Sequence, residues 1–220
     1  MFEKLFGLSR PSRPSTLIQS AVDDVCEMLR TSRRMLELSL AALLDNQPLD
    51  ADLDAMDDAV DEGERMVRRS VLEHLSFDPR KDLVLSLVLV SMVQDAERTG
   101  DFAIGLAELV PLTGKRREGP FRDELATTSK WVLPMFGQCE QVFQSGDREG
   151  AQQLIDRAAE VRRALTDYIR RVAASDLSAD LAVVYSSAAR SLRRVVAHLS
   201  NIASAVTQPY DRILHEDEGV

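Results

Sequence analysis

The chain is poor in the residues that build several common kinds of site. It has two cysteines, three histidines and one tryptophan among 220 residues, and aromatic side chains make up 5% of it. Cys26 and Cys139 fall on separate expected helices without a C-x-x-C spacing, so neither a disulfide framework nor a zinc site is expected. A core with so few rings must be built from Leu, Val, Ile, Ala and Met, which favours helix packing over a sheet sandwich.

Long apolar runs are also missing. The most apolar stretch, residues 83–93, has 11 residues, whereas a helix that spans a membrane needs roughly 20. Residues 1–8 are too short for a signal peptide and carry Glu3 and Lys4. We therefore expect a cytoplasmic protein.

Positive charge is in short supply. The chain has 27 basic and 36 acidic residues, for a formal net charge of −9. This balance argues against nucleic acid as the main partner, because phosphate contacts need a positive footprint. A hydrophobic content of 45% with 29% charged residues is typical of a folded soluble protein.

Patterns for known catalytic sites are missing too. The sequence has no Gly-rich phosphate loop and no nucleophile elbow. It has no Glu-x-x-His, which excludes the ferritin-like di-iron arrangement. The histidines do not form a ligand set, and His198 in the last expected helix is interpreted as a packing or capping residue. We therefore expect a protein that is not an enzyme.

Hydrophobic periodicity predicts six long helices and no strand. Pro48, Pro79, Pro111 and Gly146 mark turns between them. Short turns favour antiparallel neighbours. The expected fold class is all-α, with two tandem antiparallel three-helix bundles comparable to spectrin-like repeats, over residues 15–113 and 120–215. The six helices are expected at about residues 14–44, 51–75, 80–110, 121–144, 148–173 and 177–213.

The two halves resemble copies of one unit. Two acids four residues apart at 57 and 61 are matched by two more at 156 and 160. Glu97-Arg98-x-x-Asp101 then follows in the first half, and Arg193-Arg194-x-x-Ala197 stands at the corresponding place in the second. The acidic pair is therefore intact in one copy and replaced in the other.

Acidic residues are concentrated between 45 and 64, where nine of them occur without a basic residue. The spacing places Asp57, Asp61 and Glu64 on one helix face, which can meet Glu97 and Asp101 on the third helix if the two pack antiparallel. Five carboxylates in one place repel each other unless a cation or an arginine neutralises them. Ligation by oxygen alone selects a hard ion, Fe, Mn, Mg or Ca, over zinc.

A second interpretation of this face stays open. Charge-rich helix faces are usually solvated, and Arg65, Arg68 and Arg98 are near enough in sequence to pair with the acids. Gly100 stands between Glu97 and Asp101, at a cost of roughly 1 kcal/mol relative to Ala inside a helix. We expect Gly100 to mark a close approach between helices.

Four segments of the chain resemble the PhoU family. They are residues 77–83, 95–103 and 106–108 in the first half and residues 193–203 in the second. The family pattern there is a Pro, a D-L-R-like helix start, then D-L-E-R-I-G-D-H-A and N-I-A-E. The resemblance implies two tandem three-helix bundles. It also implies that Asp57, Asp61, Glu97 and Asp101 are metal ligands, with Glu64 as an additional one.

The chain departs from the family pattern at several places. Phe102 replaces the usual His and Gly105 the usual Asn, while Arg193 and Ala197 replace the two acids of the second copy. We expect the acids at 156 and 160 to face the arginines of the second copy and form a salt bridge with them. At most one metal site is therefore expected, in the first bundle.

The resemblance implies a non-enzymatic regulator of phosphate uptake and phosphate signalling. Its expected partners are a membrane transporter for phosphate or another ion, or a sensor kinase, so its membrane association is peripheral and through the partner. A homodimer stays open. Two alternatives also stay open: a metal-dependent phosphohydrolase that uses the carboxylates, and a metal-free helical scaffold accessory to another ion transporter, such as a sodium/phosphate cotransporter or a potassium system.

Overall fold

The computed structural model describes residues 15–114 and 116–213. Six long α-helices follow one another: α1 (Thr16–Leu44), α2 (Leu53–Phe77), α3 (Leu83–Ala107), α4 (Pro120–Ser145), α5 (Arg148–Ala173) and α6 (Ala179–Thr207). Two short 3-10 turns, η2 (Val110–Leu112) and η3 (Tyr210–Arg212), follow α3 and α6. The described residues contain no strand. The expected all-α class and the two-bundle fold are confirmed.

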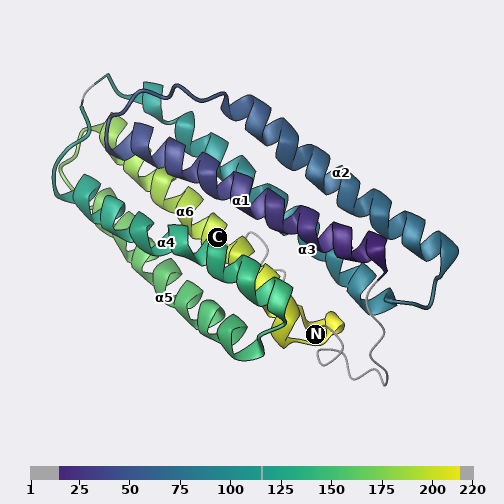
Figure 1. Ribbon diagram of the computed structural model, residues 1–220. Helices are drawn as coiled ribbons and strands as arrows, with labels where there is room; N and C mark the ends of the chain where they lie inside the picture. Colours follow the sequence, from purple (N-terminus) through teal and green to yellow (C-terminus); the bar gives the residue numbers. More distant parts are fainter. Residues whose placement is uncertain (1–14, 115, 214–220) are drawn as a thin grey trace.

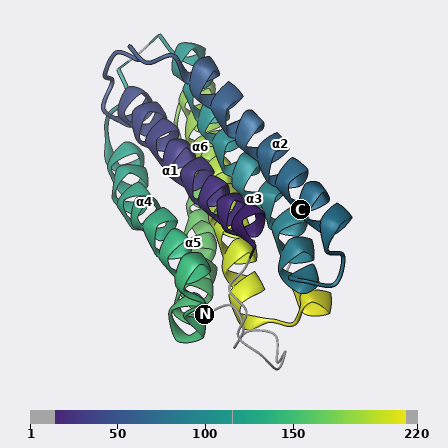
Figure 2. The ribbon, with the colours of Figure 1, turned by 45° about the vertical axis from the view of Figure 1, so that its right-hand side comes forward.

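The six helices lie roughly along one direction, with α2 and α5 on opposite outer sides (Figure 1). Helices α1, α2 and α3 pack on one another, and so do α4, α5 and α6. The two sets meet where α3 packs on α6 and α1 packs on α4, an arrangement that is also visible from a second side (Figure 2). The two copies of the repeated pattern, which lie on α3 and α6, are therefore brought together.

Local sequence accounts for the helix ends. The side chains of Ser15, Asp52 and Asp147 cap α1, α2 and α5 by accepting backbone N–H groups of the first turn, as is common for these residue types. Gly146 ends α4 in the left-handed conformation, with φ of 67°, which suits a residue without a Cβ. Pro134 lies inside α4, which continues on both sides of it.

Three expected helix boundaries were wrong, and one of them is the end of α3, at Ala107 rather than near residue 110. Helix α3 begins at Leu83 rather than near residue 80, because Asp82 adopts a left-handed φ of 52°. Its carboxylate Oδ2 accepts the backbone N–H of Ser15 at 3.0 Å, and this contact ties the start of α3 to the start of α1. Helix α6 ends at Thr207 rather than near residue 213, since Pro209 follows and η3 is a separate turn.

The core is aliphatic, as the composition predicts, and it runs through both bundles. The apolar run at residues 83–93 is not buried on all sides, because Leu83, Leu87 and Val90 are 43%, 38% and 42% exposed. None of the described helices has the length and apolar character needed to cross a membrane. Residues 1–8, residue 115 between the two expected bundles and residues 214–215 of the expected second bundle lie outside the described residues.

Candidate functional site

The five predicted ligands lie on α2 and α3, which pack against each other. Helix α2 carries Asp57, Asp61 and Glu64, and helix α3 carries Glu97 and Asp101. The carboxylate of Asp101 repels those of Asp57 and Glu97, and the carboxylate of Asp61 repels the same two groups. The structure therefore brings the five carboxylates into one electrostatically coupled group, which we call the acidic face.

Glu97 is the most perturbed member of the acidic face. Burial, followed by repulsion from Asp101, raises the pKa of Glu97 from 4.5 to about 7, against the opposing attraction of Arg98. Its side chain is 16% exposed. The Oε2 atom is buried and accepts no hydrogen bond from the described residues, although the Nε of Arg98 lies 3.5 Å away. Glu97 is thus an acid whose charged form lacks full compensation.

Asp57 shows the same effect in a weaker form. Burial raises the pKa of its carboxyl group above the ordinary value, and repulsion from Asp101 and Asp61 adds to this. Both shifts have the same cause, since a carboxylate is less stable where water is excluded and other negative charges are near. A bound cation would remove this cost for both groups.

Arginines partly neutralise the other carboxylates. Arg98 pairs with Asp101 at 2.5 Å, Arg68 pairs with Glu64 at 2.7 Å, and Arg65 reaches Asp61 at 3.4 Å. In this arrangement no group of three or more Asp, Glu, His or Cys side chains in the described ranges converges to hold a metal ion. The arginine side chains are 45–59% exposed, and exposed ion pairs of this kind contribute about 0–1 kcal/mol each.

The donor set of the acidic face fits a hard cation in its chemistry. All five side chains offer carboxylate oxygens, which suit Fe, Mn, Mg or Ca. One of these oxygens is buried without a hydrogen bond from the described residues, and the weak arginine pairs can be exchanged for a cation at low cost. Asp57, Asp61, Glu64, Glu97 and Asp101 therefore remain the predicted ligands.

Gly100 marks a close approach of three helices, as expected. A Cβ atom at this position would lie 3.4 Å from Oδ1 of Asp57, 3.4 Å from the buried Oγ of Ser32 and 3.6 Å from Val60. These neighbours come from α1 and α2. Helix α3 thus packs against both helices directly beside the acidic face, at a distance where a methyl group would make ordinary contact.

We predict that larger side chains at Gly100 disrupt this approach in proportion to their size. Gly100→Ala adds one methyl at ordinary contact distance and replaces a poor helix former, so its free energy of unfolding should change by no more than about 1 kcal/mol. Gly100→Leu overpacks the site and should cost about 1–3 kcal/mol. Urea unfolding of both variants measures the difference, and an unaffected Leu variant would contradict the close approach.

A buried polar network joins the two copies of the repeated pattern. On α3, Oδ1 of Asp95 accepts the Nδ2–H of Asn201 at 2.8 Å and lies 2.8 Å from Nδ1 of His198, both on α6. The rings of Phe102 and His198 stack at 5.7 Å, and the guanidinium of Arg194 lies over Phe102. This network was not predicted from the sequence, which placed His198 only as a packing or capping residue.

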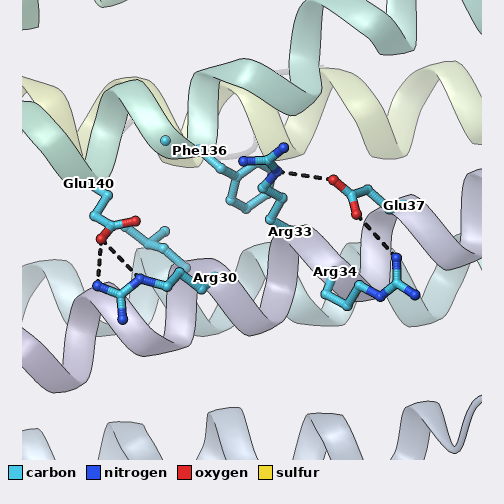
Figure 3. Close-up of a pocket in the computed structure, with 8 residues that line it drawn as sticks. Arg30, Arg33, Arg34, Glu37, Phe136 and Glu140 are labelled. Atoms are coloured by element: carbon cyan, nitrogen blue, oxygen red, sulfur yellow. Dashed lines mark hydrogen bonds and ion pairs between the residues drawn. The ribbon is translucent and has the colours of Figure 1, made fainter.

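A second contact between the bundles lies in a groove of about 270 Å³ between α1 and α4 (Figure 3). Arg30 on α1 donates through two nitrogens to Glu140 on α4, at 3.0 and 2.5 Å. Within α1, Glu37 pairs with both Arg33 and Arg34. Each of the three arginines that line this groove pairs with one of its two glutamates, so we assign the groove a structural role in joining the bundles.

Comparison with known proteins identifies the family. The model of the PhoU domain matches the chain twice, at residues 25–110 and 125–206. Together the two matches cover most of the chain, which therefore belongs to the PhoU domain family. The family resemblance seen in the sequence and the duplication of its pattern are confirmed.

Solved structures agree with this fold. A crystal structure of PhoU from Pseudomonas aeruginosa matches with a TM-score of 0.78 and 21% identity, over 86% of this chain and 95% of that one. The phosphate transport system regulatory protein PhoU from Streptococcus pneumoniae matches with a TM-score of 0.74 and 18% identity, over 86% and 92%. A search of curated proteins gives no significant match.

Proposed function

We propose that this protein is a non-enzymatic regulator of phosphate uptake and phosphate signalling. The observation that carries the proposal is the PhoU domain, matched in both halves of the chain. One protein of the same fold is described as a regulatory protein of the phosphate transport system. Regulation by docking on a cytoplasmic surface of a phosphate transporter, or of its sensor kinase, is the mode of action that we infer.

We further propose that the acidic face holds a hard divalent or trivalent cation. The coupled carboxylates on α2 and α3 and the raised pKa of Glu97 support this proposal. The cation would neutralise the mutual repulsion of these acids and fix α2 against α3. Because the acids are not part of a known catalytic motif in the sequence, we assign the cation a structural role in the regulator, and hydrolysis of phosphate esters is the second candidate function.

The docking proposal is tested by capture of partners from the cell. The tagged full-length protein is crosslinked in cells grown with scarce or abundant phosphate, and the captured membrane proteins are identified by mass spectrometry. We expect a phosphate transporter or a sensor kinase among them, in an amount that depends on the phosphate supply. Capture of transporters for other ions, without either of these, would contradict the proposal and support the accessory-scaffold alternative.

The choice between regulator and phosphohydrolase needs a separate assay. Purified protein is incubated with a chromogenic phosphate monoester and Mn(II) or Fe, beside an Asp61→Ala, Asp101→Ala double variant. We expect no hydrolysis above that of the double variant. Turnover by the natural chain that the double variant lacks would show that the acidic face is catalytic.

A further inference from the structure

The second bundle has a positively charged cleft of about 520 Å³ between α5 and α6. Four arginines line it. On α5 the spacing of Arg162, Arg163 and Arg170 places them along one side of the helix, and Arg193 joins them from α6. Thr166 and Asp167 also line the cleft.

This arginine cleft occupies the place that the acidic face has in the first bundle. In the register of the internal repeat, Asp57 and Asp61 correspond to Asp156 and Glu160, so Glu64 corresponds to Arg163. The same repeat places Arg193 where the first copy has Glu97. Two ligand positions of one bundle are therefore occupied by cations in the other.

The two bundles also differ in their overall charge. Residues 15–113 carry 20 acidic and 9 basic side chains, whereas residues 120–213 carry 11 and 12. The chain thus combines a strongly acidic first bundle with a nearly neutral second bundle, in which four of the eleven arginines line one cleft. A site of this kind attracts anions, not metal ions.

The salt bridge expected from the sequence at this place was wrong. Among the described residues, Asp156 accepts a hydrogen bond from Gln152 at 3.0 Å and Glu160 pairs with Arg157 at 3.2 Å, rather than with either arginine of the second copy. Both acids precede the arginine cleft on α5 and are not among the residues that line it. Neither acid therefore neutralises the arginines of the second copy.

Within the cleft, Asp167 pairs with Arg170 at 2.9 Å. The Nε of Arg193 is buried and has no hydrogen-bond partner among the described residues. Burial, followed by repulsion from Arg193 and Arg194, lowers the pKa of Arg162 below its ordinary value. Arg162 and Arg193 of the cleft thus repel each other, and a bound anion would relieve that repulsion.

We propose that the arginine cleft binds an oxyanion of the phosphate class, either free orthophosphate or the phosphate groups of a longer chain. Planar guanidinium groups form paired hydrogen bonds with phosphate oxygens, which makes arginine the preferred side chain for such ligands. Donors come from two neighbouring helices, so an anion between them would bridge α5 and α6. The binding of an oxyanion is independent of the proposed function. The further idea that the regulator senses phosphate through this cleft rests on the proposed function.

Isothermal titration of the purified full-length protein at constant ionic strength, with chloride as the background anion, tests the binding. The probes are orthophosphate and tripolyphosphate, used separately. We expect one saturable site per chain for at least one probe. Binding of orthophosphate identifies the free ion as the ligand, and binding of tripolyphosphate only identifies a phosphate chain.

Matched variants locate the site. Arg193→Gln and Arg163→Gln should each weaken the affinity about tenfold, as the loss of one charge-assisted hydrogen bond predicts. Arg69→Gln removes the same charge from an exposed position of the first bundle and should leave the affinity unchanged. Circular dichroism and thermal melting establish that each variant is folded.

Absence of saturable binding for both probes would overturn the proposal, and so would equal affinity of the natural chain and both cleft variants. Neither result bears on docking, because the capture experiment measures a different property of the chain. Conversely, failure to capture a transporter or kinase leaves the oxyanion site intact. The two proposals can therefore fail separately.

Discussion

Replacement of Asp95 by alanine should lower the free energy of unfolding by about 2–4 kcal/mol, the largest single effect that we expect in this protein. Asp95 is 6% exposed and its Oδ1 is the acceptor shared by His198 and Asn201. Alanine leaves both donors buried without this acceptor at the contact between α3 and α6. Chemical unfolding followed by circular dichroism measures the loss.

Two further substitutions make this prediction specific. Asp58→Ala removes an exposed acid from the crowded acidic region of α2 and should change stability by no more than about 0.5 kcal/mol. Asp95→Asn keeps an acceptor oxygen of the same size, so its loss of stability should fall between those of Asp95→Ala and Asp58→Ala. A loss below about 1 kcal/mol for Asp95→Ala would show that the network does not hold the bundles together.

Replacement of Glu97 by glutamine should have opposite effects with and without metal. The pKa of Glu97 in the fold, about 7, is raised from 4.5, so the stability that its proton confers is complete below pH 4.5 and is lost as the pH rises through 7. At pH 8 without metal, the natural chain carries the cost of an ionised, buried carboxylate. Glu97→Gln should therefore be more stable by about 1–2 kcal/mol at pH 8 and equally stable at pH 4.

A hard cation should reverse that order at pH 8. Mn(II) in hundredfold excess over its dissociation constant would stabilise the natural chain by about 2.7 kcal/mol, and Glu97→Gln should lose most of this gain. The gain should also be smaller at pH 6, because the cation must then displace a proton from Glu97. Thermal melting at pH 6 and 8, with Asp58→Asn as the matched control, measures both effects.

The result that contradicts the metal assignment is equally clear. If Mn(II), Mg(II), Ca(II) and Fe each raise the melting temperature of the natural chain and of Glu97→Gln by the same amount, the acidic face is not their site. The comparison of Glu97→Gln with the natural chain at pH 8, both without metal, would still test the raised pKa of Glu97.

Much of the fold could be predicted from the sequence because its determinants are local. Periodic Leu, Val and Ala define each helix, and Pro48, Gly146 and the capping residues define most of the turns. The end of α6 follows a local signal, Pro209, that the expected boundary ignored, whereas the start of α3 depends on a contact that a local pattern does not contain. Helix α3 begins after Asp82, whose carboxylate accepts the backbone N–H of Ser15, a residue that lies 67 positions earlier in the chain.

The candidate site divides in the same way. The four-residue spacings on α2 and α3 predicted that five carboxylates share a face, and the structure couples their charges. The link from Asp95 to His198 and Asn201 was missed because it crosses between the two copies. The signal was present in the sequence, since Asp95 belongs to the first copy of the pattern and both donors belong to the second. Alignment of the copies could have suggested it, but only the packing of α3 on α6 establishes the contact.

The central claim, that the protein regulates phosphate uptake, is tested most directly in cells. The measurement is the rate of radiolabelled phosphate uptake after transfer from scarce to abundant phosphate, in the parent, a strain lacking the gene, and that strain carrying the gene again. The account predicts that uptake in the deletion strain no longer falls when phosphate becomes abundant, and that the restored gene returns the response. A deletion strain that reduces its uptake as the parent does would contradict it.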